Sequence, residues 1–179
     1  MERIVVSDTN IFIDLVELGV LQDLFYLPWQ IHTTDFVMDE LTDAKQFDAV
    51  YSYCERGRMT VGTLTPEEVG KIFQMSSMPG CKISPADFSV ILYAQKANFN
   101  ILTGDRRLRN YAEKEGIEVH GILFVFNALV EHKILPYTLA IELLQKLKEL
   151  NKRTPVELTL DDTKSSTTFT RPGPSSGSR

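Results

Sequence analysis

Residues 4–13 read IVVSDTNIFI, and most of the expected architecture follows from this stretch. Its first four residues form a short apolar run, which is typical of a buried strand. The next three are Asp8, Thr9 and Asn10, residue types that cap the start of a helix. Apolar residues then recur at helical spacing at Ile11, Leu15, Leu18 and Leu21. The stretch therefore predicts a strand that runs directly into a helix, with Asp8 at the junction.

The same alternation of strand and helix continues along the chain. Further strands are predicted at residues 30–34, 59–62, 99–103 and 116–119. Helices are predicted after an N-cap at Asp35, over 44–55, from Thr65, from Ser84, after Asp105, over 122–132 and over 136–150. Strands that alternate with helices are joined by right-handed crossovers and form a mostly parallel sheet. We therefore expect an α/β, three-layer sandwich with a central, mostly parallel five-stranded sheet and helices on both faces.

The composition indicates one globular domain followed by a polar end. The chain has 179 residues, of which 43% are hydrophobic and 24% are charged, as in ordinary globular proteins. We expect residues 1–153 to form a single domain and residues 154–179 to form a disordered polar tail, because the tail has too few apolar side chains to bury. The sequence has no signal peptide pattern and no apolar run long enough for a membrane span, which predicts a soluble, cytoplasmic protein.

The net charge of the chain and the spacing of its cysteines and histidines argue against two classes of function. The formal net charge of −5 argues against a surface covered in nucleic-acid-binding charge, but it leaves room for a local basic strip beside an acidic site. The two cysteines and three histidines have no spacing that is typical of a zinc site.

Four acidic residues are candidates for a functional site: Asp8, Glu40, Asp87 and Asp105. Each has an alternative explanation, since the three aspartates suit helix caps and Glu40 suits a solvated helix face. Helix capping does not require the acids to meet, whereas the strand order predicts that the three aspartates lie at the same end of the sheet. Carboxylates that meet there repel one another unless a cation binds. Oxygen ligands without cysteine or histidine favour Mg²⁺ or Mn²⁺.

Four segments carry these acids: residues 5–13 (VVSDTNIFI), 37–41 (VMDEL), 84–87 (SPAD) and 102–108 (LTGDRRL). In order and spacing the sequence resembles the PIN-domain ribonucleases, a family that includes the VapC-like toxins of bacterial toxin–antitoxin pairs. The resemblance implies a central parallel sheet and cleavage of RNA with Mg²⁺ or Mn²⁺. It also implies that the four acids are both catalytic and metal-binding.

The resemblance further implies accessory residues and partners. Thr9, Asn10 and Thr103 match polar positions that orient ligands or bound water. Lys82, Arg106 and Arg107 are candidates for contacts with the RNA backbone, with plain surface charge as the alternative. An antitoxin protein and a second copy of the chain are further partners to test. Two apolar pairs, Phe25/Tyr26 and Phe124/Phe126, could serve dimerisation, although such stripes more often belong to a core.

Two other functions stay open from the sequence alone. The same pocket could be catalytically silent, in a module that binds or regulates a partner. Asp8 could instead be the phosphorylated residue of a phosphotransfer domain of the receiver or haloacid-dehalogenase kind. The dehalogenases usually have a second acid two residues on, where this chain has Asn10, and receivers have a lysine after a later strand, where this chain has residues 103–105 (TGD).

Overall fold

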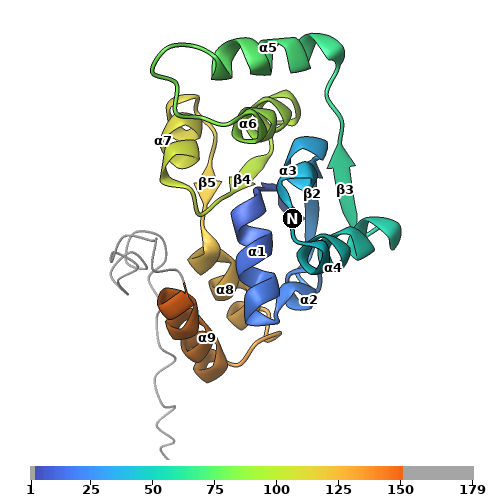
Figure 1. Ribbon diagram of the computed structural model, residues 1–179. Coiled ribbons are helices and arrows are strands. Elements are labelled where there is room, and N and C mark those ends of the chain that lie inside the picture. Colours follow the sequence, from blue (N-terminus) through green and yellow to red (C-terminus); the bar gives the residue numbers. More distant parts are fainter. Residues whose placement is uncertain (1–2, 151–179) are drawn as a thin grey trace, which may run out of the picture.

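The computed structural model describes residues 3–150, and its centre is a five-stranded sheet in which every pairing is parallel (Figure 1). The strands lie in the order β3-β2-β1-β4-β5. Their bounds are β1 Arg3–Ser7, β2 Trp29–Thr34, β3 Met59–Gly62, β4 Asn100–Leu102 and β5 Val119–His120. Val5 and Val6 point to opposite faces of β1 and are both fully buried, so both faces of the sheet are covered. The predicted α/β sandwich with helices on both faces is confirmed.

The helices connect these strands in the predicted alternation. Their bounds are α1 Thr9–Leu18, α2 Leu21–Leu24, α3 Asp35–Glu40, α4 Ala44–Glu55, α5 Pro66–Ser76, α6 Pro85–Ala97, α7 Arg106–Lys114, α8 Ile122–Glu131 and α9 Tyr137–Leu150. Helix α6 packs on β1, β2 and β4, whereas α1 packs with α4 and α9. Figure 1 shows α5 beyond the ends of the strands, where it crosses α6.

One hydrophobic core lies between the layers, and its largest fully buried side chains include Phe12, Phe88 and Phe126. Because neighbouring parallel strands all end on the same side, the segments after β1, β2 and β4 emerge together at the carboxyl edge of the sheet. The four acids follow these strands or lie on the helices next to them.

The fourth strand is shorter than predicted, at Asn100–Leu102 in place of 99–103, and two other elements differ more. The first predicted helix extends to Leu21, but α1 ends at Leu18, because Gly19 adopts a left-handed conformation (φ 74°) and Leu21 begins the separate helix α2. The fifth strand was predicted over 116–119 but contains only Val119 and His120. Gly116 and Ile117 still complete the end of α7, since their N–H groups bond to carbonyls of that helix.

The apolar pairs that could serve dimerisation belong mainly to the core. Phe25 is buried and stacks on Tyr53, and Phe126 is 1% exposed. Phe124 stacks on Trp29, while Tyr26 stays exposed.

No helix among residues 3–150 is long and apolar enough to cross a membrane. The predicted tail, residues 154–179, lies outside the described residues.

Candidate functional site at the carboxyl edge of the sheet

Asp8 lies between β1 and α1, where it caps the helix as predicted. Its backbone N–H donates to the carbonyl of Leu102 on the neighbouring strand β4 (3.0 Å). The side chain is only 2% exposed, and its Oδ1 accepts a hydrogen bond from the N–H of Thr9 (2.7 Å). Its Oδ2 accepts from Asn10 Nδ2 (3.1 Å) and Thr103 Oγ1 (2.9 Å). The carboxylate is therefore held in one orientation by three donors.

Thr9 connects Asp8 to Glu40. Its backbone N–H bonds to Asp8, while its side-chain Oγ1 donates to Oε2 of Glu40 (2.8 Å). Glu40 is the last residue of α3 and is exposed. Because α3 follows β2, this contact joins the segments that leave two neighbouring strands.

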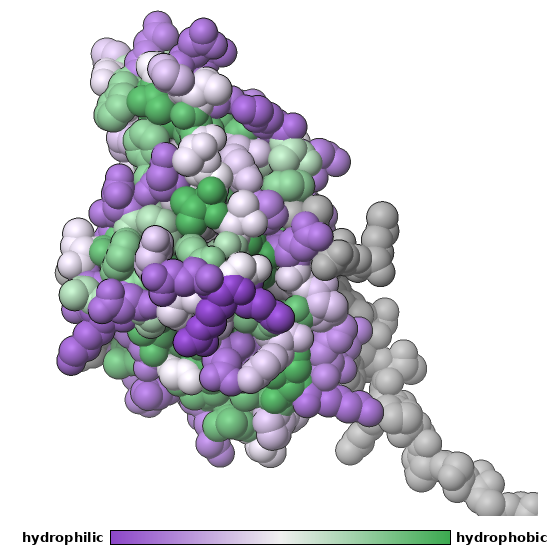
Figure 2. All heavy atoms as spheres, turned by 90° about the vertical axis from the view of Figure 1, so that its right-hand side faces the viewer, coloured by the Kyte–Doolittle hydropathy of each residue, from purple (hydrophilic) through white to green (hydrophobic). Residues whose placement is uncertain are grey.

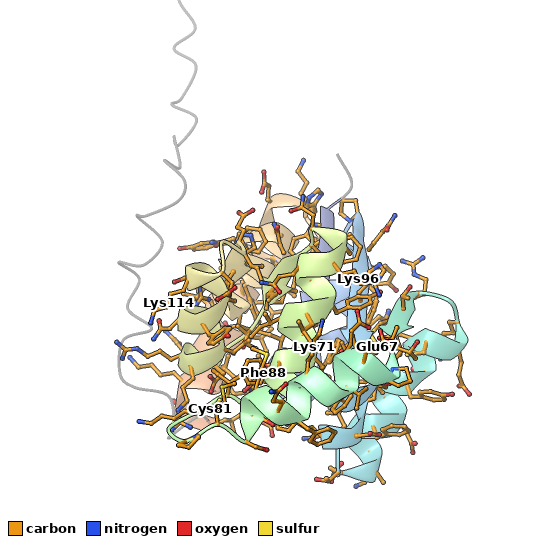
Figure 3. All side chains as sticks on the ribbon, turned by 90° about the horizontal axis from the view of Figure 1, so that it is seen from above. Glu67, Lys71, Cys81, Phe88, Lys96 and Lys114 are labelled. Carbon is orange, nitrogen blue, oxygen red and sulfur yellow. The ribbon has the colours of Figure 1, made fainter. Side chains whose placement is uncertain are left out.

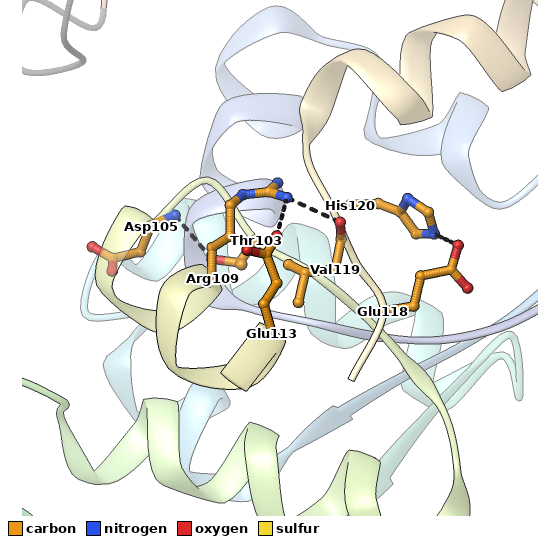
Figure 4. Close-up of polar contacts among 7 residues, drawn as sticks. All are labelled: Thr103, Asp105, Arg109, Glu113, Glu118, Val119 and His120. Atoms are coloured by element: carbon orange, nitrogen blue, oxygen red, sulfur yellow. Dashed lines mark hydrogen bonds and ion pairs between the residues drawn. The ribbon is translucent and has the colours of Figure 1, made fainter. Parts of the chain in front are cut away.

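Thr103 makes the corresponding connection on the other side of Asp8. Its Oγ1 donates to Asp8 and accepts a hydrogen bond from the backbone N–H of Asp105 (2.9 Å), as Figure 4 shows for the second contact. Asp105 caps α7 and accepts from the N–H groups of Arg107 (2.7 Å) and Leu108 (2.9 Å) through Oδ1. A chain of hydrogen bonds thus runs from Glu40 through Thr9, Asp8 and Thr103 to Asp105.

Asp87 lies in the first turn of α6, in the predicted capping box with Ser84. Its N–H donates to Ser84 Oγ (3.0 Å), and its Oδ2 accepts from the N–H of Ser84 (3.0 Å). The capping explanation is therefore correct for all three aspartates. Helix capping does not prevent the three aspartates from lying close together, because helices that start at the ends of parallel strands begin at the same edge of the sheet.

Negative charge from neighbouring acids raises the pKa of two of the four residues, Asp8 and Asp87. Burial, followed by the negative charge of Asp87, raises the pKa of Asp8 from 3.8 to about 7, against the lowering effect of its three hydrogen bonds. Burial is also the main cause of the raised pKa of Asp87, and the charges of Asp105 and Glu40 add to it, whereas the hydrogen bonds from Ser84 lower it. Asp8 and Asp87 therefore interact electrostatically, and Asp105 and Glu40 act on Asp87 at the same edge of the sheet.

No basic side chain of the described residues neutralises these acids through an ion pair. The ion pairs between residues 3 and 150 are Lys96–Glu68, Arg109–Glu113 and His120–Glu118. The donor set consists of hard carboxylate oxygens, and the capping bonds use Oδ2 of Asp87 and Oδ1 of Asp105. The other oxygen of each carboxylate is thus left for another ligand, which suits a Mg²⁺ or Mn²⁺ ion.

The grouping of the acids is nevertheless loose. Within residues 3–150, no set of three or more histidine, cysteine, aspartate or glutamate side chains is arranged tightly enough to hold a metal ion. The chemistry of the donors fits a divalent cation, and their present separation requires the carboxylates to move together when one binds.

The predicted RNA-binding cations lie at the surface. Arg106 and Arg107 are exposed in the first turn of α7, directly after Asp105, and Lys82 is exposed in the segment that leads to α6. Arg109, which the sequence did not single out, has a structural role (Figure 4). It donates to the carbonyl of Val119 (2.9 Å) and pairs with Glu113 (3.4 Å), so it attaches α7 to β5.

A second feature that the sequence did not indicate is the buried pair Thr34 and Ser89. Their hydroxyl oxygens are 2.6 Å apart, and both side chains are fully buried. Thr34, rather than the expected Asp35, is the N-cap of α3, since its Oγ1 accepts from the N–H of Val37 (3.3 Å). The pair joins α3, which carries Glu40, to α6, which carries Asp87. In the sequence, the only hint of this pair is that Thr34 lies next to a predicted helix start.

A parallel sheet with acids at its carboxyl edge defines an α/β domain with a candidate cation site. The DUF3368 family model, described as a PIN domain, matches residues 4–162. The chain belongs to the PIN domain family, whose members are generally nucleases.

Several solved structures are similar to this chain. VapBC-1 from nontypeable Haemophilus influenzae is 18% identical, with 67% of this chain and 98% of that chain covered and a TM-score of 0.46. VapBC2 from Rickettsia felis, bound to a DNA fragment from its promoter, is 13% identical, with coverages of 66% and 98% and a TM-score of 0.45. FitAcB from Neisseria gonorrhoeae is 16% identical, with coverages of 64% and 95% and a TM-score of 0.40. A comparison with curated proteins found no match.

Proposed function

We propose that this PIN domain is an endoribonuclease that requires Mg²⁺ or Mn²⁺ and hydrolyses phosphodiester bonds in RNA. One observation carries the proposal: carboxylates from four separate segments lie at one edge of the sheet, where negative charge from neighbouring acids raises the pKa of Asp8 and of Asp87, with no ion pair from a described basic residue. Such an arrangement is costly for folding alone and is explained by a bound cation.

In this proposal Asp8, Asp87 and Asp105 hold the ion, and Glu40 lies near a second ion or a water molecule. When bound, the ion supplies an activated water and stabilises the negative charge that develops on the phosphate. Thr9 and Thr103 keep the carboxylates of Glu40 and Asp8 in fixed orientations through their hydrogen bonds. Asp8 must release its proton before its oxygens can bind a cation, so we expect weaker cation binding below about pH 7.

The contacts with the substrate follow from the same geometry. Arg106 and Arg107 directly follow Asp105, and Lys82 lies in the segment that leads to α6. All three are exposed and would contact backbone phosphates, which positions RNA without reading its sequence. Asn10 would keep Asp8 oriented through its hydrogen bond.

The predicted antitoxin partner and cytoplasmic location belong to this proposal. Relief of growth arrest by co-expression with a neighbouring gene would test the antitoxin.

A nuclease assay on mixed RNA tests the proposal. The parent should cleave RNA with Mg²⁺ or Mn²⁺ and stop when a chelator is added. Asp8→Asn should abolish cleavage, because it removes a buried ionised ligand, while Asp39→Asn should leave cleavage unchanged, since Asp39 is exposed next to Glu40 and belongs to none of the site's contacts described above. Equal cleavage by Asp8→Asn and the parent would refute the assignment.

The two alternatives give different results. A catalytically silent module would bind no Mn²⁺ in calorimetry, or would bind it without cleaving RNA. A phosphotransfer domain would gain the mass of a phosphoryl group after incubation with acetyl phosphate.

A further inference from the structure

Two aromatic side chains meet at the carboxyl edge, outside the acids. Phe36 in the first turn of α3 and Phe73 on α5 have ring centroids 6.2 Å apart, with their planes inclined by 54°. Phe73 is 52% exposed although its ring is large and apolar, and Phe36 is half-buried. An exposed phenylalanine ring gives up the free energy that burial would provide, so the position of Phe73 calls for an explanation.

The pair is adjacent to one of the acids. Phe36 and Glu40 are four residues apart on α3, which places them on the same side of the helix with about 5–6 Å between their Cβ atoms. Glu40 is in turn hydrogen-bonded to Thr9, next to Asp8. The aromatic pair therefore lies directly beside one end of the chain of hydrogen bonds that joins the acids.

The order of the strands arranges these groups along a line. Glu40 follows β2, Asp8 follows β1 and Asp105 follows β4, and these three strands are neighbours. With neighbouring strands about 4.8 Å apart, the acids span roughly 10 Å of the edge. The aromatic pair lies at the β2 end of this line, and the exposed Arg106 and Arg107 lie at the β4 end.

We propose that Phe36 and Phe73 form a platform on which an unpaired base of single-stranded RNA stacks while the adjacent backbone passes over the acids. This inference rests on the proposed function and adds two residues that would contact a base next to the scissile bond. Base stacking on exposed aromatic side chains tolerates any base, because every base has a π-face. The arginines at the opposite end hold the phosphates that follow.

The surroundings of the pair favour a base over a protein partner. The exposed residues of α5 around Phe73 are mostly polar or small, namely Glu67, Gly70, Lys71 and Gln74. Figure 3 shows Glu67 and Lys71 on α5 where the helix crosses α6, and Figure 2 shows hydrophobic side chains in small groups among hydrophilic ones. A stable protein interface buries about 800 Å² on each partner, far more than two rings provide, whereas one base matches their size.

The test measures RNA binding separately from cleavage. Fluorescence anisotropy is recorded with Mg²⁺ and a labelled oligoadenylate of about ten nucleotides, in the Asp8→Asn background so that the probe is not cleaved. Phe73→Ala should weaken binding by roughly 5- to 100-fold, the range expected for one stacked base. Phe73→Leu should weaken it similarly, because it keeps an apolar side chain without a ring, and Phe73→Trp should bind like the background protein.

Tyr137→Ala is the matched control, since Tyr137 is a 67% exposed aromatic residue on α9, remote from the acids in the sequence and the fold. Equal affinities for Phe73→Ala and Tyr137→Ala would overturn the platform. A loss of mass from dimer to monomer in Phe73→Ala, measured by light scattering, would overturn it too, because the rings would then belong to an interface between copies.

The two proposals can fail separately. If the parent cleaves RNA and Phe73→Ala binds normally, the platform is wrong and the nuclease stands. If the parent cleaves no RNA and Phe73→Ala still loses affinity for the oligonucleotide, the nuclease is wrong and the platform stands as a binding site.

Discussion

Asp8 couples the stability of the protein to pH through a single buried carboxyl group. Its pKa is 3.8 in an exposed chain and about 7 in the folded protein, so the folded state holds the proton more tightly. Without metal, the free energy of unfolding should therefore fall as pH rises from about 4 to 7. The contribution of this one group is roughly 1.4 kcal/mol for each pH unit. In Asp8→Asn this contribution is absent, and the melting temperature should depend less on pH over that range.

Thermal melts at several pH values in chelator measure this difference between parent and variant. Asp39→Asn serves as the control, because it removes an exposed acid from the neighbouring helix. Parallel pH profiles for the parent and Asp8→Asn would contradict a carboxyl group that stays protonated to about pH 7.

At the scale of single residues, the sequence indicated the acids but not all of their supports. Asp8 stands out because it directly follows an apolar strand, Asp105 because it lies just past the end of another, and Asp87 because of its spacing from Ser84. The pairing of Thr34 with Ser89 joins residues 55 positions apart, and no local pattern specifies such a contact. The loose grouping of the carboxylates was also not predictable, since spacing along a chain defines which edge a side chain reaches but not its final distance from others.

At the scale of elements, the contact between β3 and α6 depends on the absence of a side chain. A Cβ atom at Gly62, the last residue of β3, would lie 2.2 Å from Cε2 of Tyr93 on α6. Gly62→Ala should therefore displace the ring and weaken its hydrogen bond to Nδ1 of His32 (3.0 Å). We expect a loss of about 1–3 kcal/mol in the free energy of unfolding, measured by urea denaturation.

Gly70→Ala on α5 provides the matched comparison, because a Cβ there meets nothing within 4 Å. That change should stabilise the protein by about 0.5–1 kcal/mol, as expected for alanine in place of glycine inside a helix. The same sign of effect for both alanine variants would show that Tyr93 does not restrict position 62.

Most elements could be predicted because their ends carry strong local signals. The capping boxes at Thr65 and Ser84 predict the starts of α5 and α6, and the apolar runs predict the central strands. β5 was misplaced because its two residues form too short a segment for a periodic pattern. The first helix was predicted too long because Leu21 continues the apolar spacing beyond Gly19, where the backbone turns.

At the scale of the whole molecule, a cation bound at the carboxyl edge should stabilise the entire fold. The ligands of the proposed site come from segments that follow β1 and β4 and from α6, so they are brought together only in the folded chain. Mn²⁺ at about 100 times its dissociation constant should raise the free energy of unfolding by about 2.7 kcal/mol. For a chain of this size the melting temperature should rise by roughly 5–10 °C.

Differential scanning calorimetry with MnCl₂, against KCl at equal ionic strength, measures the shift. Asp105→Asn should reduce it, since that change removes one charged ligand of the proposed site. A melting temperature that does not respond to Mn²⁺ would count against a cation at the acids.

The order of strands and helices along the chain was enough to predict which segments reach the same edge of the sheet. Parallel strands with helical crossovers bring their ends to one edge, so the convergence of Asp8 and Asp105 could be predicted from element order alone. The contact of Phe36 with Phe73 could not, because it depends on how α5 lies across the end of the molecule.

Each aspartate of the site also helps to start a helix through hydrogen bonds from backbone N–H groups, which affects how mutational scans should be interpreted. Alanine at position 8, 87 or 105 would remove a helix start worth about 0.5–2 kcal/mol together with the negative charge, so lost activity would also reflect a frayed helix. Asparagine keeps an oxygen that can accept from the backbone and removes only the charge. An alanine scan of this edge would therefore overstate the catalytic importance of the three aspartates, because each of them both stabilises a helix start and is a proposed ligand of the cation.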